Sequence, residues 1–198
     1  RELDMLIKIK HPNIVQFLGY VGNPFIIVTE YISNGDLLKY ITNNKFNLKK
    51  KIDICLDILE ALIYLHNRKP NNIIHRDIKP QNILITSTIK AKLVDFGLSR
   101  LFNNFDNKNS INNNKLNYLP NDLTNKVGSK RYMAPELNNS NIYDFKIDIW
   151  SCGIVFMELF ENRRYYKPFK LTKTPLKVIK IIKSYMININ PKERLNAT

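Results

Sequence analysis

The chain has 198 residues, 31 Lys and Arg against 17 Asp and Glu, and a formal net charge of +14, so it is long enough for one substantial core or most of a larger domain. Dense positive charge ordinarily suggests a polyanionic partner, but Asn, Ile and Lys are inflated together, at 27, 27 and 23 residues, which indicates a compositional bias, so we expect no nucleic-acid partner. With two cysteines, no apolar run of membrane-spanning length and no signal-peptide pattern, the sequence excludes a disulfide framework and predicts a cytoplasmic protein without a membrane span.

The N-terminal part of the sequence predicts a helix, a hairpin and a second helix. Apolar residues recur at helical spacing over residues 1–10, and His11-Pro12 ends this helix because Pro cannot continue the hydrogen-bond ladder. Short β-branched runs over 14–21 and 25–30 flank a Gly-Asn-Pro turn, which is typical of a hairpin. The next helix opens near Asp36, whose carboxylate would stabilise a helix N-terminus even without a ligand.

Two longer helices are predicted in the rest of the chain. Over residues 48–66 the apolar side chains recur every three or four positions, which indicates a helix with one buried face. That face would consist of Ile52, Cys55, Leu56, Leu59, Leu62, Ile63 and His66. Residues 144–160 are apolar nearly all round, as in a fully buried helix, and Asp148 is the polar exception that needs hydrogen-bond donors.

The other segments are polar or basic. Residues 103–125 contain ten Asn and almost no periodicity, which predicts a long polar loop. A basic series without any acidic residue comes after the buried helix, and we expect it to form a solvated face rather than a docking patch. Its members are Arg163, Arg164, Lys167, Lys170, Lys173, Lys177, Lys180 and Lys183.

The stretch 73–82 holds the densest chemistry of the sequence. It places Asp77, Lys79 and Asn82 in a short loop between two apolar runs, and Asp95-Phe96-Gly97 begins thirteen residues after Asn82. Each motif alone is typical of an ordinary turn, but the ordered set, completed by Ala134-Pro135-Glu136, is rarely met by chance. These residue types suit phosphoryl transfer, which needs a base for the nucleophile, oxygen ligands for metal ions and a cation beside the moving group.

The ordered set resembles the eukaryotic protein kinase catalytic domain, and the resemblance covers the whole chain. It implies an α+β fold with a mainly helical large lobe and a truncated antiparallel strand lobe at the N-terminus. Residues 1–30 would be a remnant of the small lobe, 31–198 the hinge and large lobe, and 98–133 an activation segment with an Asn-rich insertion. The implied function is ATP-dependent phosphorylation of a protein substrate on Ser or Thr. Lys79 favours Ser/Thr over Tyr specificity, while the hinge sequence indicates the tyrosine-kinase-like group of Ser/Thr kinases.

The resemblance assigns a role to each residue of the motifs. Asp77 would accept the proton of the substrate hydroxyl, Lys79 would contact the transferred phosphate, and Asn82 and Asp95 would bind Mg²⁺.

Further residues would hold ATP. Glu30 and Ile32 would bind adenine through their backbone groups, and Leu84 would belong to the same nucleotide site. Asp36 would lie near the ribose, an interpretation of equal weight to helix capping. Glu2 would pair with the Lys of the family's third strand, although a helix-surface position is the stronger interpretation of Glu2 by itself.

The resemblance also implies contacts that shape and regulate the site. Asp148 would accept backbone N–H groups of the catalytic loop, and Arg194 would pair with Glu136. Arg76 would bind a phosphate that an upstream activating kinase places on Thr124. The alternative, of similar weight, is that Arg76 supports the loop through backbone carbonyls.

The sequence departs from the family pattern in several places. It does not begin with Met, it contains no glycine-rich loop or third-strand Lys, and the connection after residue 160 is too short for the family's helix G. We therefore expect a fragment that binds ATP weakly and exposes apolar side chains over 14–28. The alternative function is a catalytically inactive pseudokinase that acts as an interaction module, which loss of Asp77, Asn82 or Asp95 would favour; all three are present.

Overall fold

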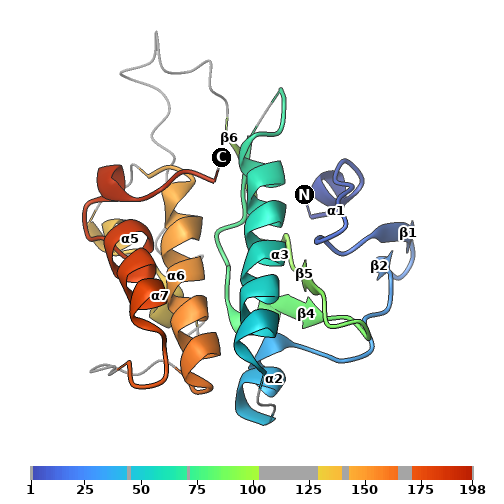
Figure 1. Ribbon diagram of the computed structural model, residues 1–198. Coiled ribbons are helices and arrows are strands. Elements are labelled where there is room, and N and C mark those ends of the chain that lie inside the picture. The colour runs from blue at the N-terminus through green and yellow to red at the C-terminus, as the bar shows by residue number, and fades with distance from the viewer. Residues whose placement is uncertain are drawn as a thin grey trace, which may run out of the picture.

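The computed structural model describes residues 2–43, 46–70, 72–102, 129–139, 143–164 and 171–197. Figure 1 shows α7, α6 and α3 side by side, with β4, β5 and the hairpin β1–β2 on the side of α3 away from α6, and the hairpin farthest from α7. The bounds of these elements are Leu176–Ile181 for α7, Lys146–Glu161 for α6, Leu48–His66 for α3, Phe17–Val21 for β1 and Ile26–Thr29 for β2. The α+β architecture with an antiparallel N-terminal hairpin is confirmed.

Helix α3 begins and ends where its periodicity predicts. Asn47 caps it, because the Asn47 side chain accepts a hydrogen bond from the Lys50 N–H at 2.9 Å. The predicted face is correct for three positions and wrong for three others: Ile52, Leu56 and Ile63 are exposed at 40%, 51% and 38%. The apolar residues that α3 buries are Ile54, Cys55, Ile58, Ala61, Leu62 and Leu65. The prediction failed because α3 is apolar on more than one side, and its contacts with α6 and with strands on the other side decide which residues are covered.

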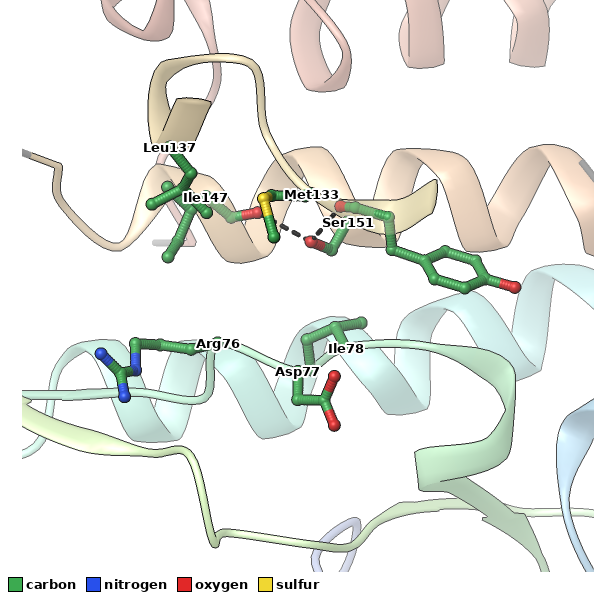
Figure 2. A pocket seen from close by; sticks show the side chains of 8 residues that line it. Arg76, Asp77, Ile78, Met133, Leu137, Ile147 and Ser151 are labelled. Atoms are coloured by element: carbon green, nitrogen blue, oxygen red, sulfur yellow. Dashed lines mark hydrogen bonds between the residues drawn. The ribbon is translucent and has the colours of Figure 1, made fainter. Parts of the chain in front are cut away.

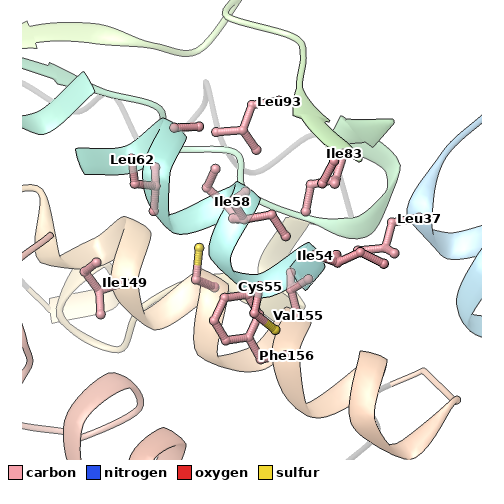
Figure 3. Packing of buried hydrophobic residues seen from close by; sticks show 14 of the residues in the cluster. Leu37, Ile54, Cys55, Ile58, Leu62, Ile83, Leu93, Ile149, Val155 and Phe156 are labelled. Carbon is pink, nitrogen blue, oxygen red and sulfur yellow. The ribbon is translucent and has the colours of Figure 1, made fainter. Parts of the chain in front are cut away.

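Helix α6 is buried nearly all round, as its sequence predicts. It packs against α3, and Figure 3 shows Ile149, Val155 and Phe156 of α6 facing the side of α3 that carries Cys55. Asp148, Glu158 and Glu161 of α6 are also fully buried, so each needs polar partners inside the core. The α3–α6 pair is the core on which the rest of the chain is arranged.

Two pairs of short antiparallel strands bring the two sequence motifs together. Strand β3 (Asn72–Ile74) leads into the loop 75–82 and pairs with β6 (Arg100–Phe102). Strand β4 (Ile83–Ile85) leaves that loop and pairs with β5 (Ala91–Leu93), which precedes Asp95. The strands before and after the loop that contains His75-Arg76-Asp77 are therefore paired with the strands after and before Asp95-Phe96-Gly97.

The hairpin β1–β2 exposes apolar side chains, as expected for most of it. Leu18 and Phe25 are exposed at 59% and 62%, and Tyr20, Val21, Ile26 and Val28 are exposed as well. The expectation was wrong for Ile14 and Val15, which are buried because this segment runs along β5: the Val15 N–H donates to the Leu93 carbonyl at 2.9 Å.

The remaining elements are short. They are α1 (Glu2–Leu6), α2 (Leu37–Asn43), η1 (Pro80–Asn82), η3 (Ser129–Tyr132), α5 (Glu136–Asn139), the π-turn η4 (Ile182–Met186) and η5 (Pro191–Glu193). Residues 162–164 and 171–175, the described part of the connection from α6 to α7, contain no helix, and the expected lack of the family's helix G stays a prediction. Within the described ranges, no helix has the length and apolar character needed to cross a membrane.

Candidate active site

The backbone of the loop 75–82 is fixed by Asp148 of α6. The Asp148 carboxylate accepts the N–H groups of His75 and Arg76, each at 2.9 Å, and the Nε2–H of His66 at 2.9 Å. Burial by itself raises the pKa of Asp148, but the hydrogen bonds from His66 and from the Arg76 N–H lower that pKa below its usual value. The expected contact between Asp148 and the catalytic loop is confirmed, and it helps to hold Arg76 in the left-handed region at φ 69°.

Lys79 and Asn82 both donate a hydrogen bond to the same carboxylate oxygen of Asp77. Oδ2 of Asp77 accepts hydrogen bonds from Lys79 Nζ at 2.6 Å and from Asn82 Nδ2 at 2.9 Å. Asn82 Nδ2 also donates to the Asp77 carbonyl at 2.9 Å. Asp77 and Asn82 are buried, and Lys79 keeps 13% of its side chain exposed. Two donors therefore fix the direction of the Asp77 carboxylate.

His75 joins this loop to the segment that carries Asp95. Its Nε2–H donates to the Val94 carbonyl at 3.1 Å, and its Nδ1 accepts the Asp77 N–H at 3.3 Å, a pattern that requires a neutral ring. Burial lowers the pKa of His75 more than the neighbouring carboxylates raise it, which supports the neutral form. The ring also packs against the fully buried Phe96, with 5.0 Å between ring centroids.

Asp95 is presented on a strained backbone beside Asn82. Its φ of 66° lies in the left-handed region, which a side chain such as Asp occupies at a cost and which is typical of functional sites. The Gly97 N–H donates to Asp95 Oδ1 at 3.3 Å, and the Val94 N–H donates to the Asn82 carbonyl at 3.0 Å. The second hydrogen bond ties the segment that carries Asp95 to the end of the catalytic loop.

The chemistry of these side chains fits Mg²⁺ held jointly with a phosphate. Mg²⁺ prefers oxygen ligands and is commonly held by one or two carboxylates together with substrate phosphates. The two hydrogen bonds of the Asn82 amide are both donated by Nδ2, which leaves Oδ1 available among the described residues. No cluster of three or more His, Cys, Asp and Glu residues that could hold a metal occurs in the described ranges, so a closed all-protein site is not formed there.

Of the residues expected to hold ATP, Glu30 directly follows β2 and Leu84 lies in β4. The Glu30 carboxylate accepts the Gln16 N–H at 2.8 Å and Lys92 Nζ at 2.6 Å, so it ties the hinge to β5. Oδ1 of Asp36 accepts a hydrogen bond from the Lys39 N–H at 3.0 Å, which is the helix-capping role. The backbone of Asp36 also forms an isolated antiparallel β-bridge with that of the half-buried Leu84.

Two further residues complete this prediction. Ile32 of the hinge is buried, at 8% exposure. The side chain of Glu2 lies outside the described part of the chain, so its pairing stays a prediction.

Comparison with known proteins identifies the family. The chain matches the protein kinase domain over residues 1–198. The chain belongs to the protein kinase family.

Its relatives include serine/threonine kinases of plants and of Dictyostelium. Serine/threonine-protein kinase VIK of Arabidopsis thaliana is 38% identical over 180 residues, which cover 87% of this chain and 39% of the relative. Serine/threonine-protein kinase 12 of the same plant is 39% identical over 166 residues, 82% of this chain and 33% of the relative. The probable serine/threonine-protein kinase gdt4 of Dictyostelium discoideum is 36% identical over 184 residues, 88% of this chain and 10% of the relative. The chain thus spans well under half the length of the relatives it matches.

The stretch 98–133, which we expect to be the activation segment, is described at its two ends. Residues 103–128 lie outside the described ranges, and so does the predicted phosphate acceptor Thr124, whose modification by an upstream kinase stays a prediction. The Arg76 guanidinium donates from Nε to the Leu98 carbonyl and from Nη1 to the Tyr143 hydroxyl at 3.0 Å. The first contact is the backbone support that the alternative role of Arg76 requires. Ser99 is fully buried and donates to the His75 carbonyl at 3.3 Å.

The end of the kinase activation segment is anchored by the predicted ion pair. Arg194 donates from Nη1 and Nη2 to the two carboxylate oxygens of Glu136 at 2.6 Å and 2.9 Å. The Arg194 side chain is completely buried, and its guanidinium lies 4.9 Å from the centre of the Trp150 ring. This contact was expected from the family resemblance and is confirmed.

A small cavity of about 20 Å³ lies beside Asp77. Figure 2 shows Arg76, Asp77 and Ile78 of the catalytic loop on one side of it, and Met133 and Ser151 on the other. Ser151 Oγ donates to the Tyr132 carbonyl at 2.7 Å, so α6 holds the end of the activation segment over the catalytic loop. Among the described residues, this is the hollow next to the proposed base.

Sequence reasoning missed two polar partners of the kinase site. The Glu30–Lys92 ion pair joins the residue after β2 to the middle residue of β5. The only indication of a partner for Lys92 is its half-buried position between two buried residues of β5. His66 was assigned to the buried face of α3 as an apolar contact, yet its ring donates to Asp148. A polar side chain on a buried helix face was the available signal for a hydrogen-bond partner.

Proposed function

We propose that this chain carries out ATP-dependent transfer of the γ-phosphoryl group to a Ser or Thr hydroxyl of a protein substrate. The observation that carries the proposal is the Asp77 carboxylate, held by Lys79 Nζ and Asn82 Nδ2 beside a hollow that faces the activation segment. Its relatives bear serine/threonine kinase names, which supports this substrate class. We further propose a location in the reducing cytoplasm, which suits the two free, buried cysteines.

In this mechanism Asp77 accepts the proton of the substrate hydroxyl as that oxygen bonds to the γ-phosphorus of ATP, while the bond from this phosphorus to the bridging oxygen breaks and ADP leaves. Lys79, already beside Asp77, supplies positive charge where negative charge develops on the transferred group. Asn82 and Asp95 would hold Mg²⁺, which when bound neutralises charge on the phosphates. Glu30 and Ile32 would orient adenine through the hinge backbone, with Leu84 and Asp36 beside the nucleotide. The arrangement positions groups in advance of the reaction rather than supplying a covalent intermediate.

The decisive test is Asp77→Asn in a chimera in which a glycine-rich loop and a third-strand Lys precede residue 1. We expect kcat to fall by about two orders of magnitude or more, because a positioned general base contributes about that much, while ATP binding is kept. The matched control is Asp53→Asn, the same change on the partly exposed side of α3. An unchanged kcat in Asp77→Asn, with the control equally active, would remove Asp77 from the mechanism. A complete lack of transfer in the parent chimera would instead favour the pseudokinase alternative.

The metal assignment is tested by binding rather than turnover. In the same chimera, Asp95→Ala should abolish the additional thermal stabilisation that Mg²⁺ gives to the ATP complex, because a ligand stabilises the folded state by an amount that grows with the logarithm of its concentration divided by Kd. Stabilisation by ATP without Mg²⁺ should change little. An undiminished Mg²⁺ effect in Asp95→Ala would show that the ion is held elsewhere.

A further inference from the structure

The outer face of α7 and η4 mixes lysines with exposed aliphatic and aromatic side chains. Leu176 is exposed at 84% and Ile181 at 51%; Lys177 and Lys180 are exposed between them, and Lys183 is exposed two residues after Ile181. At about 100° per residue these positions fall on the arc opposite the inward side of the helix. A face that only needs to be solvated does not require large exposed apolar side chains, so this mixture indicates a contact surface.

This face is held in a fixed orientation by the opposite side of the same segment. Ile182 and Met186 are buried against the core that contains α6. A Cβ atom on Gly153 of α6 would lie 2.6 Å from Ile187 Cγ2, so only glycine permits the observed approach of the two segments. Figure 1 shows α7 at the edge of the molecule, beside α6 and far from the hairpin. The lysines therefore project from a rigid support at one end of the molecule.

The charge of this region has one sign. The sequence between Glu161 and Glu193 contains nine Lys and Arg and no Asp or Glu. Of the two acidic residues that bound this stretch, Glu161 is buried and its carboxylate accepts the N–H groups of Thr172, Lys173 and Thr174, each at 2.9 Å, while Glu193 is exposed at the far end of the stretch. A general excess of Lys in the sequence would not by itself remove every acid from one stretch.

We propose that the face of Leu176, Lys177, Lys180, Ile181 and Lys183 docks on the surface of a bilayer that contains anionic phospholipid. Surface lysines are attracted by anionic headgroups, and their aliphatic stems lie along the interface while their ammonium groups stay hydrated. Exposed Leu and Ile side chains gain by entering the boundary between headgroups and acyl chains. A nucleic acid would satisfy the lysines but would leave Leu176 and Ile181 in water, so the combination favours the lipid surface. The cytoplasmic leaflet, on the side of the membrane where we place the protein, is the anionic one.

The test is co-sedimentation of the 198-residue chain with vesicles of phosphatidylcholine alone or with added phosphatidylserine. The chain should bind the anionic vesicles and release from them as salt is raised, because screening weakens surface attraction. The triple variant Lys177→Glu, Lys180→Glu, Lys183→Glu should bind about one hundred-fold more weakly, at about five-fold for each lysine. The double variant Leu176→Ser, Ile181→Ser should lose about ten-fold, because it keeps the charge and removes apolar area.

The matched control is Lys8→Glu, Lys10→Glu, Lys69→Glu, three exposed lysines near α1 and the end of α3. It changes net charge by the same amount and should retain most of the vesicle binding, and all variants should show the circular dichroism spectrum of the parent. Failure of the parent chain to bind anionic vesicles, or an equal loss in the control triple, would overturn the proposal. Binding of duplex DNA through the same lysines, without vesicle binding, would also overturn it and would make nucleic acid the partner.

Discussion

The backbone of the catalytic loop is held by hydrogen bonds to two buried side chains, those of Asp148 and His75. Asp148 receives the two backbone N–H groups at the start of the loop, while His75 receives the Asp77 N–H and donates to the Val94 carbonyl. The position of the proposed base thus depends on residues that would never touch substrate. These hydrogen bonds require a neutral His75 ring and an ionised Asp148 carboxylate. The stability of the loop conformation therefore depends on pH.

We predict that the free energy of unfolding falls as pH is lowered from 7 to 5, partly through His75. Burial lowers the pKa of His75 in the folded chain below its ordinary value of 6.5. The unfolded chain therefore binds a proton that the folded chain resists, so the stabilisation is complete above the unfolded pKa and is lost as pH falls toward the folded one. The slope owed to His75 is at most about 1.4 kcal/mol per pH unit.

Urea unfolding over this pH range should show a smaller slope in His75→Gln than in the parent chain. His11→Gln is the control, because the pKa of His11 is also lowered by burial but its side chain is only half-buried, so its removal should flatten the curve less. A slope that is the same in His75→Gln and in the parent would contradict a neutral, proton-excluding His75.

At the scale of elements, Arg194 joins three parts of the large lobe. Its guanidinium bonds both carboxylate oxygens of Glu136 in α5, the carbonyl of Lys146 in α6 and, through Nε, the carbonyl of Asn188. We predict that Arg194→Ala lowers the free energy of unfolding by about 3 kcal/mol, because removal of one member of a buried pair leaves the other uncompensated. Arg194→Lys should lower the free energy of unfolding by a large part of the same amount, since an ammonium group cannot make the bidentate contact.

Urea denaturation of both variants measures the effect, and Lys192→Ala, an exposed neighbour, is the control and should change stability little. A loss below about 1 kcal/mol in Arg194→Ala would show that the pair acts like a surface ion pair.

The long helices and the motif contacts were predictable, and the reasons are physical. The bounds of α3 follow from its period and its Asn47 cap, and the burial of α6 from an apolar surface nearly all round. The contacts of Asp148 and the Glu136–Arg194 pair followed from the family resemblance because the motifs stand at the family's positions. No such rule existed for the buried face of α3, since two apolar faces compete and only tertiary contacts choose between them.

Polar contacts between distant segments were the other part that sequence could not supply. Glu161, the last residue of α6, accepts N–H groups from three successive residues of the connection that follows, including Thr174. Burial by itself raises the pKa of Glu161, but these N–H groups and the Thr174 hydroxyl lower it to about 2. This capped carboxylate fixes residues 172–174 against the end of α6, and nothing in the periodicity of the sequence signals that contact.

At the scale of the whole molecule, stability is unevenly distributed. The α3–α6 pair shares the large buried cluster, whereas β1–β2 is an isolated two-stranded sheet with an exposed apolar face. A two-stranded hairpin is marginally stable unless other elements cover it. The contacts that hold it to the large lobe include the Val15–Leu93 and Glu30–Lys92 hydrogen bonds, both directed to β5.

We therefore predict that the amides of β1 and β2 in the 198-residue chain exchange with solvent at least about one hundred-fold faster, relative to their intrinsic rates, than those of α3 and α6. The reason is that the hairpin can open without disturbing the buried cluster, while α3 and α6 exchange only when the core unfolds. Hydrogen exchange followed by mass spectrometry measures both regions in one experiment. Lys92→Met should increase exchange in β2 by removing the partner of Glu30 and should leave α6 unchanged, whereas Lys90→Met, which removes the exposed partner of Asp57, should leave β2 unchanged. Equal protection of the hairpin and of α6 would mean that the molecule opens as one cooperative unit, and that the hinge side of the nucleotide site is as firmly built as the catalytic loop.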